Sequence, residues 1–170
     1  MFWISKKLVW IPAYALLLYA IIRQFGWRHT ILIVLFVAAL ITLSDQAASG
    51  FLKPKVERLR PCKKDSPVYD SVHTVEGKCG GKYGFVSSHA ANFFALATFM
   101  SFVFRRNKPW VFLVFFAAAL LVAYTRVYLG VHYPGDVICG GLLGILVGIG
   151  LGWGYVKLSR TRLLPPKAVT

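Results

Sequence analysis

A short stretch between two apolar segments, Thr125–Asp136, contains an arginine, a histidine and an aspartate. If the chain becomes helical at Pro134, Asp136 lies in the first turn and can reach back to a ring nitrogen of His132. A carboxylate on one nitrogen fixes the tautomer and leaves the other nitrogen with a lone pair, which makes a histidine nucleophilic. Arg126 offers a planar set of donors suited to phosphate oxygens. The alternative is a membrane-edge loop with an anchoring arginine and a hydrogen-bonded histidine.

A second candidate piece, Gly84–His89, comes directly before another apolar segment. Ser87 or Ser88 can cap the helix that follows, and the start of a helix presents backbone N–H groups that favour a phosphate. His89 would stand beside that phosphate, placed to give a proton to a leaving oxygen. The alternative is a capped membrane helix with an interfacial histidine.

A third piece, Lys53–Pro61, carries two cations seven positions apart. A short helix over Lys53–Leu59, broken at Pro61, would bring Lys53 and Arg60 to one face, where they could clamp an anion. Taken alone, a basic helix next to a membrane is more often solvated or lipid-facing.

The composition indicates which elements must position these pieces. The chain has 170 residues, which suggests one domain over 1–170, and it is 57% hydrophobic with a mean hydropathy of +0.61. We therefore expect an all-α, polytopic transmembrane helical bundle. The net charge is +14, and the basic residues fall between the apolar runs. This placement favours membrane lipids and phosphate substrates as partners over nucleic acid. Five spans are predicted, at roughly Leu8–Ile22, Thr30–Ala48, His89–Phe104, Pro109–Tyr124 and Val137–Lys157.

Five crossings would place the long interfacial loop between spans 2 and 3, Lys53–Gly84, on the same face as Tyr124–Gly135. The opposite face would receive the short basic loops Arg23–His29 and Arg105–Lys108 and the basic C-terminal tail. Cytoplasmic loops carry an excess of Lys and Arg, so the three candidate pieces are expected on the extracytoplasmic face.

Other residues leave alternatives open. Cys62 and Cys79 in the long loop could form a disulfide on an oxidising face or remain free thiols on a reducing one. A metal site combining them with His73 lacks the ligand spacing of known zinc sites, so no metal is expected. Asp45, near the end of the second span, is either functional or a structural partner of a nearby cation. Glycines spaced four apart in the fifth span favour close helix packing, within one bundle or between subunits, over a merely flexible span.

Together, the three pieces resemble the type 2 phosphatidic acid phosphatase (PAP2) superfamily, whose signature has three parts. The first, Lys, six residues and Arg-Pro, is intact from Lys53 to Pro61. The second, Pro-Ser-Gly-His, appears as Val86-Ser87-Ser88-His89. The third, Ser-Arg, five residues, His, three residues and Asp, appears with Thr125 in place of serine. The resemblance covers about half of the chain.

The resemblance implies a phosphohistidine mechanism without a cofactor or metal. His132 would be the nucleophile, Asp136 would orient it, and His89 would protonate the leaving group and then activate water. Side chains and backbone amides of the remaining motif residues would hold the phosphoryl oxygens; these residues are Lys53, Arg60, Ser87, Ser88 and Arg126.

The expected function is that of a lipid phosphatase in the bacterial inner membrane, with its active site on the periplasmic face. The substrate would be a lipid phosphate, with undecaprenyl diphosphate as the first expectation. Phosphatidylglycerol phosphate, phosphatidic acid and a phosphate on lipid A are alternatives. A phosphotransferase of the same architecture and a non-catalytic lipid-binding or transport protein are the rival classes. The sequence does not decide the oligomeric state.

Overall fold

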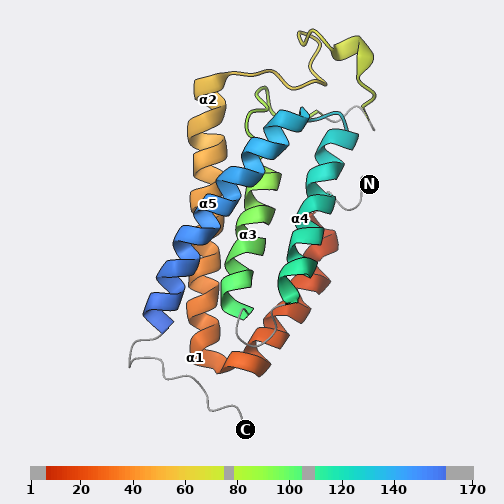
Figure 1. The fold of residues 1–170 in the computed structure, drawn as a ribbon. Coiled ribbons are helices and arrows are strands. Elements are labelled where there is room, and N and C mark those ends of the chain that lie inside the picture. Colours follow the sequence, from red (N-terminus) through yellow and green to blue (C-terminus); the bar gives the residue numbers. More distant parts are fainter. Residues whose placement is uncertain (1–6, 75–78, 105–109, 160–170) are drawn as a thin grey trace.

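The computed structural model describes residues 7–74, 79–104 and 110–159, and within them every regular element is helical (Figure 1). The expectation of an all-α fold is therefore confirmed. An isolated β-bridge joins Leu59 to Tyr83. In chain order the elements are η2 (Lys7–Trp10), α1 (Ile11–Asp45), a π-helical segment η3 (Gln46–Leu52), α2 (Lys53–Val56), η4 (Tyr69–Ser71), α3 (Ser88–Phe104), α4 (Val111–Tyr128) and α5 (Pro134–Ser159).

Helix α1 is sharply kinked at Gly26, where φ is 76° and ψ is 169°. Glycine adopts a positive φ without the steric penalty of a Cβ atom. The Thr30 hydroxyl donates to the Gly26 carbonyl oxygen at 2.8 Å, which satisfies an acceptor at the kink. Figure 1 shows two arms that diverge from this point. The first two predicted spans are thus the two arms of one kinked helix.

Three helical stretches are long and apolar enough to cross a membrane: Leu8–Val56, Val111–Tyr128 and Pro134–Ser159. Helix α3 is also apolar, but shorter. The chain is therefore an integral membrane protein, whereas five crossings remain a prediction. The predicted basic loop Arg105–Lys108, the start of the fourth span at Pro109 and the C-terminal tail lie outside the described residues.

Helix α5 packs against α3 through the glycines that the sequence places four apart. A Cβ atom built on Gly140 would lie 2.6 Å from the Ser87 carbonyl oxygen, and one on Gly148 would lie 2.7 Å from that of Ala95. Both glycines are buried. Small residues allow helix backbones to approach this closely. The glycine stripe therefore packs within the chain.

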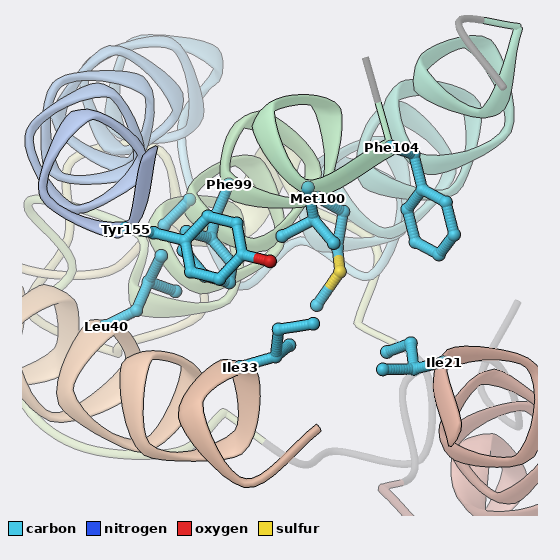
Figure 2. Close-up of a cluster of buried hydrophobic side chains, with 9 residues drawn as sticks. Ile21, Ile33, Leu40, Phe99, Met100, Phe104 and Tyr155 are labelled. Carbon is cyan, nitrogen blue, oxygen red and sulfur yellow. The ribbon is translucent and has the colours of Figure 1, made fainter. Parts of the chain in front are cut away.

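A hydrophobic cluster joins α3 to α1 and α5 (Figure 2). Phe99 is fully buried, stacks on Phe36 of α1 with ring centroids 5.9 Å apart, and meets Tyr155 of α5 edge to face at 5.7 Å. In Figure 2, Met100 points from α3 toward Ile33 of α1. This cluster fixes the second half of α3 between its neighbours, and a smaller cluster of Ala48, Val86 and Ala91 packs at its first turn.

The predicted helix Lys53–Leu59 is wrong in its second half. Helix α2 ends at Val56, and Glu57 adopts the left-handed conformation with φ of 52°. The following residues pair their backbone with the segment before α3, since Gly84 N donates to the Arg58 carbonyl oxygen at 2.8 Å. Helical geometry is also disfavoured for a residue that precedes a proline, as Arg60 does. Lys53 and Arg60 therefore reach the site from a helix and an extended segment.

Cys62 and Cys79 form a disulfide, with Cα atoms 5.6 Å apart. The disulfide alternative is therefore confirmed, and a metal site that uses these two thiols is excluded. The loop it closes contacts the segment before α5, because the Ser66 and Tyr133 hydroxyls lie 3.1 Å apart. His73 is exposed on this loop.

Candidate active site

The three candidate pieces lie at one end of the bundle. Figure 1 shows the end of α4, the beginnings of α3 and α5, and α2 gathered there, opposite the kink of α1. Direct contacts join them. Lys53 Nζ lies 2.6 Å from Ser88 Oγ, and Ser87 N donates to the Asp136 carbonyl oxygen at 2.9 Å. The structure therefore connects the first piece to the second and the second to the third.

His132 and Asp136 contact each other as the sequence predicts. Helix α5 begins at Pro134, which places Asp136 in its first turn. Asp136 Oδ2 lies 3.5 Å from His132 Nδ1 and accepts a hydrogen bond from Tyr133 N at 3.0 Å. His132 is 4% exposed and Asp136 is 0% exposed, so water does not compete for this contact.

The other ring nitrogen of His132 faces a cation. Arg60 Nη1 lies 3.1 Å from Nε2 and 3.3 Å from the Val131 carbonyl oxygen. A guanidinium only donates, so Nε2 must accept and the ring proton must be on Nδ1, toward Asp136. Burial lowers the pKa of His132, the Arg60 and Lys53 charges lower it further, and Asp136 opposes the shift. A neutral ring with its lone pair on Nε2 is the nucleophilic form.

Several buried polar atoms have no hydrogen-bond partner among the described residues. Arg60 Nε, Arg126 Nη2 and the Ser87 hydroxyl belong to this set. Buried donors are normally paired, and a phosphoryl group would bring the oxygen acceptors that these atoms lack. The predicted capping role of Ser87 is wrong, because its hydroxyl is unpaired; the Ser88 hydroxyl contacts Ser49 and Lys53.

The cations of the site repel one another. Arg126 is 8% exposed and experiences the charge of Arg60, and Lys53 also experiences Arg60. Burial lowers the pKa of Arg60 from its ordinary value, while Asp136 counters the shift. Like charges in a poorly hydrated place are costly without an anion between them. The site is therefore suited to a multiply charged anion such as phosphate.

A cavity of about 570 Å³ opens between the two arms of α1 and the face of α3, and it includes His89 and Ser88. Its other polar lining residues are Asp45 and Asn92, and the rest is almost wholly apolar. Asp45 accepts from the Ser49 hydroxyl at 3.4 Å and interacts electrostatically with Lys53, which fits the alternative of a structural partner for a nearby cation. His89 thus lies where the candidate site and an apolar cavity meet.

Sequence reasoning missed Arg58. Its Nη1 donates to Asp136 Oδ1 at 3.1 Å, and its guanidinium carbon lies 4.2 Å from the centre of the Tyr133 ring. In the expected helix, residues two apart point in different directions; in an extended chain, they point to the same side. The available signal for Arg58 was the sequence Arg58-Leu59-Arg60 before a proline. In an extended segment this sequence would place both guanidinium groups on the same side of the chain.

No cluster of three or more His, Cys, Asp or Glu side chains suited to a metal ion is found within the described part of the chain. The charged groups that the structure does gather here are lysine and arginine side chains, because Lys53 and Arg126 both experience the charge of Arg60.

Apolar helices with a buried histidine and several cations at one end define an integral membrane protein with a candidate phosphoryl-transfer site. Comparison with known families supports this description, because the PAP2 superfamily matches residues 30–160. The chain belongs to the PAP2 superfamily.

Curated relatives include a lipid A 4'-phosphatase from Bacteroides thetaiotaomicron, 43% identical over 88% of this chain and 64% of the relative. An undecaprenyl-diphosphatase from Sulfolobus acidocaldarius is 34% identical over 82% of this chain and 60% of the relative. The chain thus spans less than two thirds of the length of these relatives. The crystal structure of a phosphatidylglycerolphosphate phosphatase from Bacillus subtilis shares the fold, with a TM-score of 0.63, 22% identity, and coverage of 93% of this chain and 74% of that one.

Proposed function

We propose that this protein is a lipid phosphatase that works through a phosphohistidine at His132. The observation that carries the proposal is the placement of the His132 ring between Arg60 and Asp136, 3.1 Å and 3.5 Å away, which leaves the Nε2 lone pair beside a cation. A protein that only bound lipid headgroups would need the cations and no oriented nucleophile.

In the first step, Nε2 of His132 forms a bond to phosphorus as the bond from phosphorus to the leaving oxygen breaks. His89 gives its proton to that oxygen, so the lipid leaves as an alcohol. The ring becomes positively charged, and Asp136 stabilises the Nδ1–H that faces it. One difficult displacement is thereby divided into two easier ones.

In the second step, water attacks the phosphorus of the phosphohistidine, and His89 accepts a proton from that water. The bond between phosphorus and Nε2 breaks, and inorganic phosphate leaves. Both steps spread charge over the phosphoryl oxygens, where Lys53, Arg60 and Arg126 would act. A well-placed donor of this kind contributes about 3 kcal/mol to catalysis in other enzymes. The Ser87 hydroxyl and backbone amides near Ser88 complete the proposed phosphate site.

The relatives favour a phosphate on lipid A as the substrate. The higher identity, 43%, is to a protein named lipid A 4'-phosphatase, against 34% to the one named undecaprenyl-diphosphatase. Lipid A, an alternative in the sequence analysis, therefore replaces undecaprenyl diphosphate as the first candidate. Undecaprenyl diphosphate remains the second candidate, because one relative is named undecaprenyl-diphosphatase.

Two observations support a lipid substrate and an outward-facing site. The apolar cavity beside His89 offers a place for a hydrocarbon chain that is attached to the phosphate. The disulfide between Cys62 and Cys79 at the same end of the bundle suits an oxidising compartment. The kink at Gly26, within the predicted basic loop Arg23–His29, lies at the opposite end of the bundle (Figure 1). We therefore propose that the site faces the periplasm from a bacterial inner membrane.

Phosphate release in detergent, with a chelator present, tests the proposal. Lipid A, undecaprenyl diphosphate, phosphatidylglycerol phosphate and phosphatidic acid would be compared, and the fastest should be lipid A. His132→Ala should abolish release, while His73→Ala on the exposed loop should retain it. A labelled donor separates the rivals, because a phosphotransferase would pass the label to another lipid and a binding protein would release none.

A further inference from the structure

Arg58 contacts the Asp136 carboxylate through the oxygen that does not face His132. Arg58 Nη1 donates to Asp136 Oδ1 at 3.1 Å, whereas Oδ2 receives Tyr133 N at 3.0 Å and faces His132. The two carboxylate oxygens therefore have separate partners, and the rotation of the carboxylate is fixed at both ends. The side chain of Asp136 is 0% exposed and that of Arg58 is 42% exposed, so the cation enters from the surface.

Arg58 is itself held in this orientation. Its guanidinium carbon lies 4.2 Å from the centre of the Tyr133 ring, and the Tyr133 hydroxyl lies 3.1 Å from that of Ser66. Its backbone carbonyl accepts from Gly84 N at 2.8 Å. An arginine on an aromatic face keeps its donors in a defined direction. The segment after α2 therefore presents Arg58 to Asp136 in one geometry.

We infer that Arg58 is a positioning residue for phosphoryl transfer, which acts through Asp136 on His132 and does not bind the phosphoryl group. The inference rests on the proposed phosphatase function. The donor of Arg58 is directed at Asp136, while Arg60, two residues further along the extended segment, contacts the ring of His132. The two arginines thus have different tasks.

Removing Arg58 would leave Asp136 Oδ1 without its cation in a buried place. A buried carboxylate that loses its partner turns toward whatever donors or water it can reach. Such a turn takes Oδ2 away from His132 Nδ1, and the ring then loses the contact that keeps its lone pair on Nε2. The chemical step slows, whereas phosphate binding by the other cations continues.

The experiment measures steady-state kinetics with a chelator present, on whichever of lipid A, undecaprenyl diphosphate, phosphatidylglycerol phosphate and phosphatidic acid the wild type hydrolyses fastest; lipid A is the expected one. It compares the wild type, Arg58→Met, Arg58→Lys, Asp136→Asn and the double variant Arg58→Met/Asp136→Asn. Arg58→Met should lower kcat roughly tenfold to a hundredfold, the scale seen when a residue that orients a metal-binding side chain is replaced, with KM nearly unchanged. Arg58→Lys should recover much of the rate, because the contact uses a single nitrogen. In the Asp136→Asn background, Arg58→Met should cost nothing further.

Lys55→Met is the matched control. It removes one positive charge from α2, three residues before Arg58, and Lys55 lies over the ring of Phe51 at 5.1 Å. Its kcat should equal that of the wild type. Gel filtration and thermal unfolding in detergent verify that each variant is folded; if Arg58→Met is not, Arg58→Gln, which also removes the charge, takes its place and should show the same loss of kcat.

Three results would overturn the inference. A raised KM with an unchanged kcat in Arg58→Met would make Arg58 a phosphate-binding residue. Equal losses from Arg58→Met with and without Asp136 would show a role independent of that carboxylate. If the wild type is active and Arg58→Met has the same rate, the role of Arg58 is refuted and the proposed function stands. If the wild type has no phosphatase activity, the proposed function itself is refuted.

Discussion

Two regions supply the candidate site, and they are built differently. The pair α3 and α5 places Ser87 and Asp136 through backbone packing at glycines. The connection from Glu57 to Gly84 supplies Arg58 and Arg60 from irregular chain, fixed by a few hydrogen bonds and one disulfide. The support of His132, the proposed nucleophile, thus comes from the helix pair, and part of the positive charge comes from the connection. Perturbing each region should therefore produce a different defect.

The largest effect is expected where the helix pair holds the orienting carboxylate. Asp136→Asn should lower kcat by about 10⁴-fold, as when the equivalent orienting group is removed from a serine-protease triad, because the amide no longer favours the required tautomer of His132. Single-turnover phosphate release would measure the loss. A loss below tenfold would mean that the helix pair does not support the nucleophile in this way.

The packing of the helix pair is the next target. Gly144→Ala puts a Cβ atom into the backbone of Ala91, whereas a Cβ atom added to Gly150 would meet no other atom within 4 Å, which makes Gly150→Ala the matched control on the same helix. We expect Gly144→Ala to destabilise the protein by about 1–3 kcal/mol and Gly150→Ala to be neutral or slightly stabilising. Thermal unfolding in detergent measures both; equal behaviour of the two would contradict the close contact.

The connection should respond to loss of its disulfide with lower activity. Arg60 lies two residues before Cys62, so Cys62→Ser with Cys79→Ser should loosen the cation that faces His132 and lower kcat/KM about tenfold. Cys139→Ser, at an exposed position on α5, is the control and should leave the rate unchanged. Full activity of the double variant would show that the connection holds Arg60 without its disulfide.

The smallest effect is a pH dependence that belongs to both regions. Burial holds the pKa of His132 below its ordinary value of 6.5, so the unfolded chain takes up its proton at a higher pH than the folded one. Stability then falls as the pH drops below 6.5, and kcat/KM should fall with its midpoint below that value, because only the neutral ring is nucleophilic. A midpoint above 6.5 in the free enzyme would contradict this assignment.

Sequence reasoning recovered the helix pair well and the connection poorly. Apolar runs and glycine spacing predict helices and their close packing, and the spacing of His132, Pro134 and Asp136 predicts a contact within one helical turn. These are local rules. The path of Arg58 to Arg60 depends on pairing with Tyr83 and Gly84, more than twenty residues away, which periodicity does not indicate.

The side chains around the second piece also escaped prediction. Ser87 or Ser88 was expected to cap α3, but the Ser87 hydroxyl is buried and unpaired and the Ser88 hydroxyl contacts Lys53. A serine before a helix is a good capping candidate in isolation. Its actual use depends on which other pieces of the chain lie beside it, and that arrangement is a property of the whole bundle.

Identification of the phosphorylated residue tests the central proposal most directly. Wild-type protein would be mixed with a phosphate-labelled lipid phosphate, quenched within one turnover under alkaline conditions that preserve a phosphorus–nitrogen bond, and mapped by mass spectrometry. We expect an acid-labile phosphoryl group on His132 that is absent from His132→Ala. Label on His89 or Ser87, or rapid turnover without any labelled residue, would contradict it.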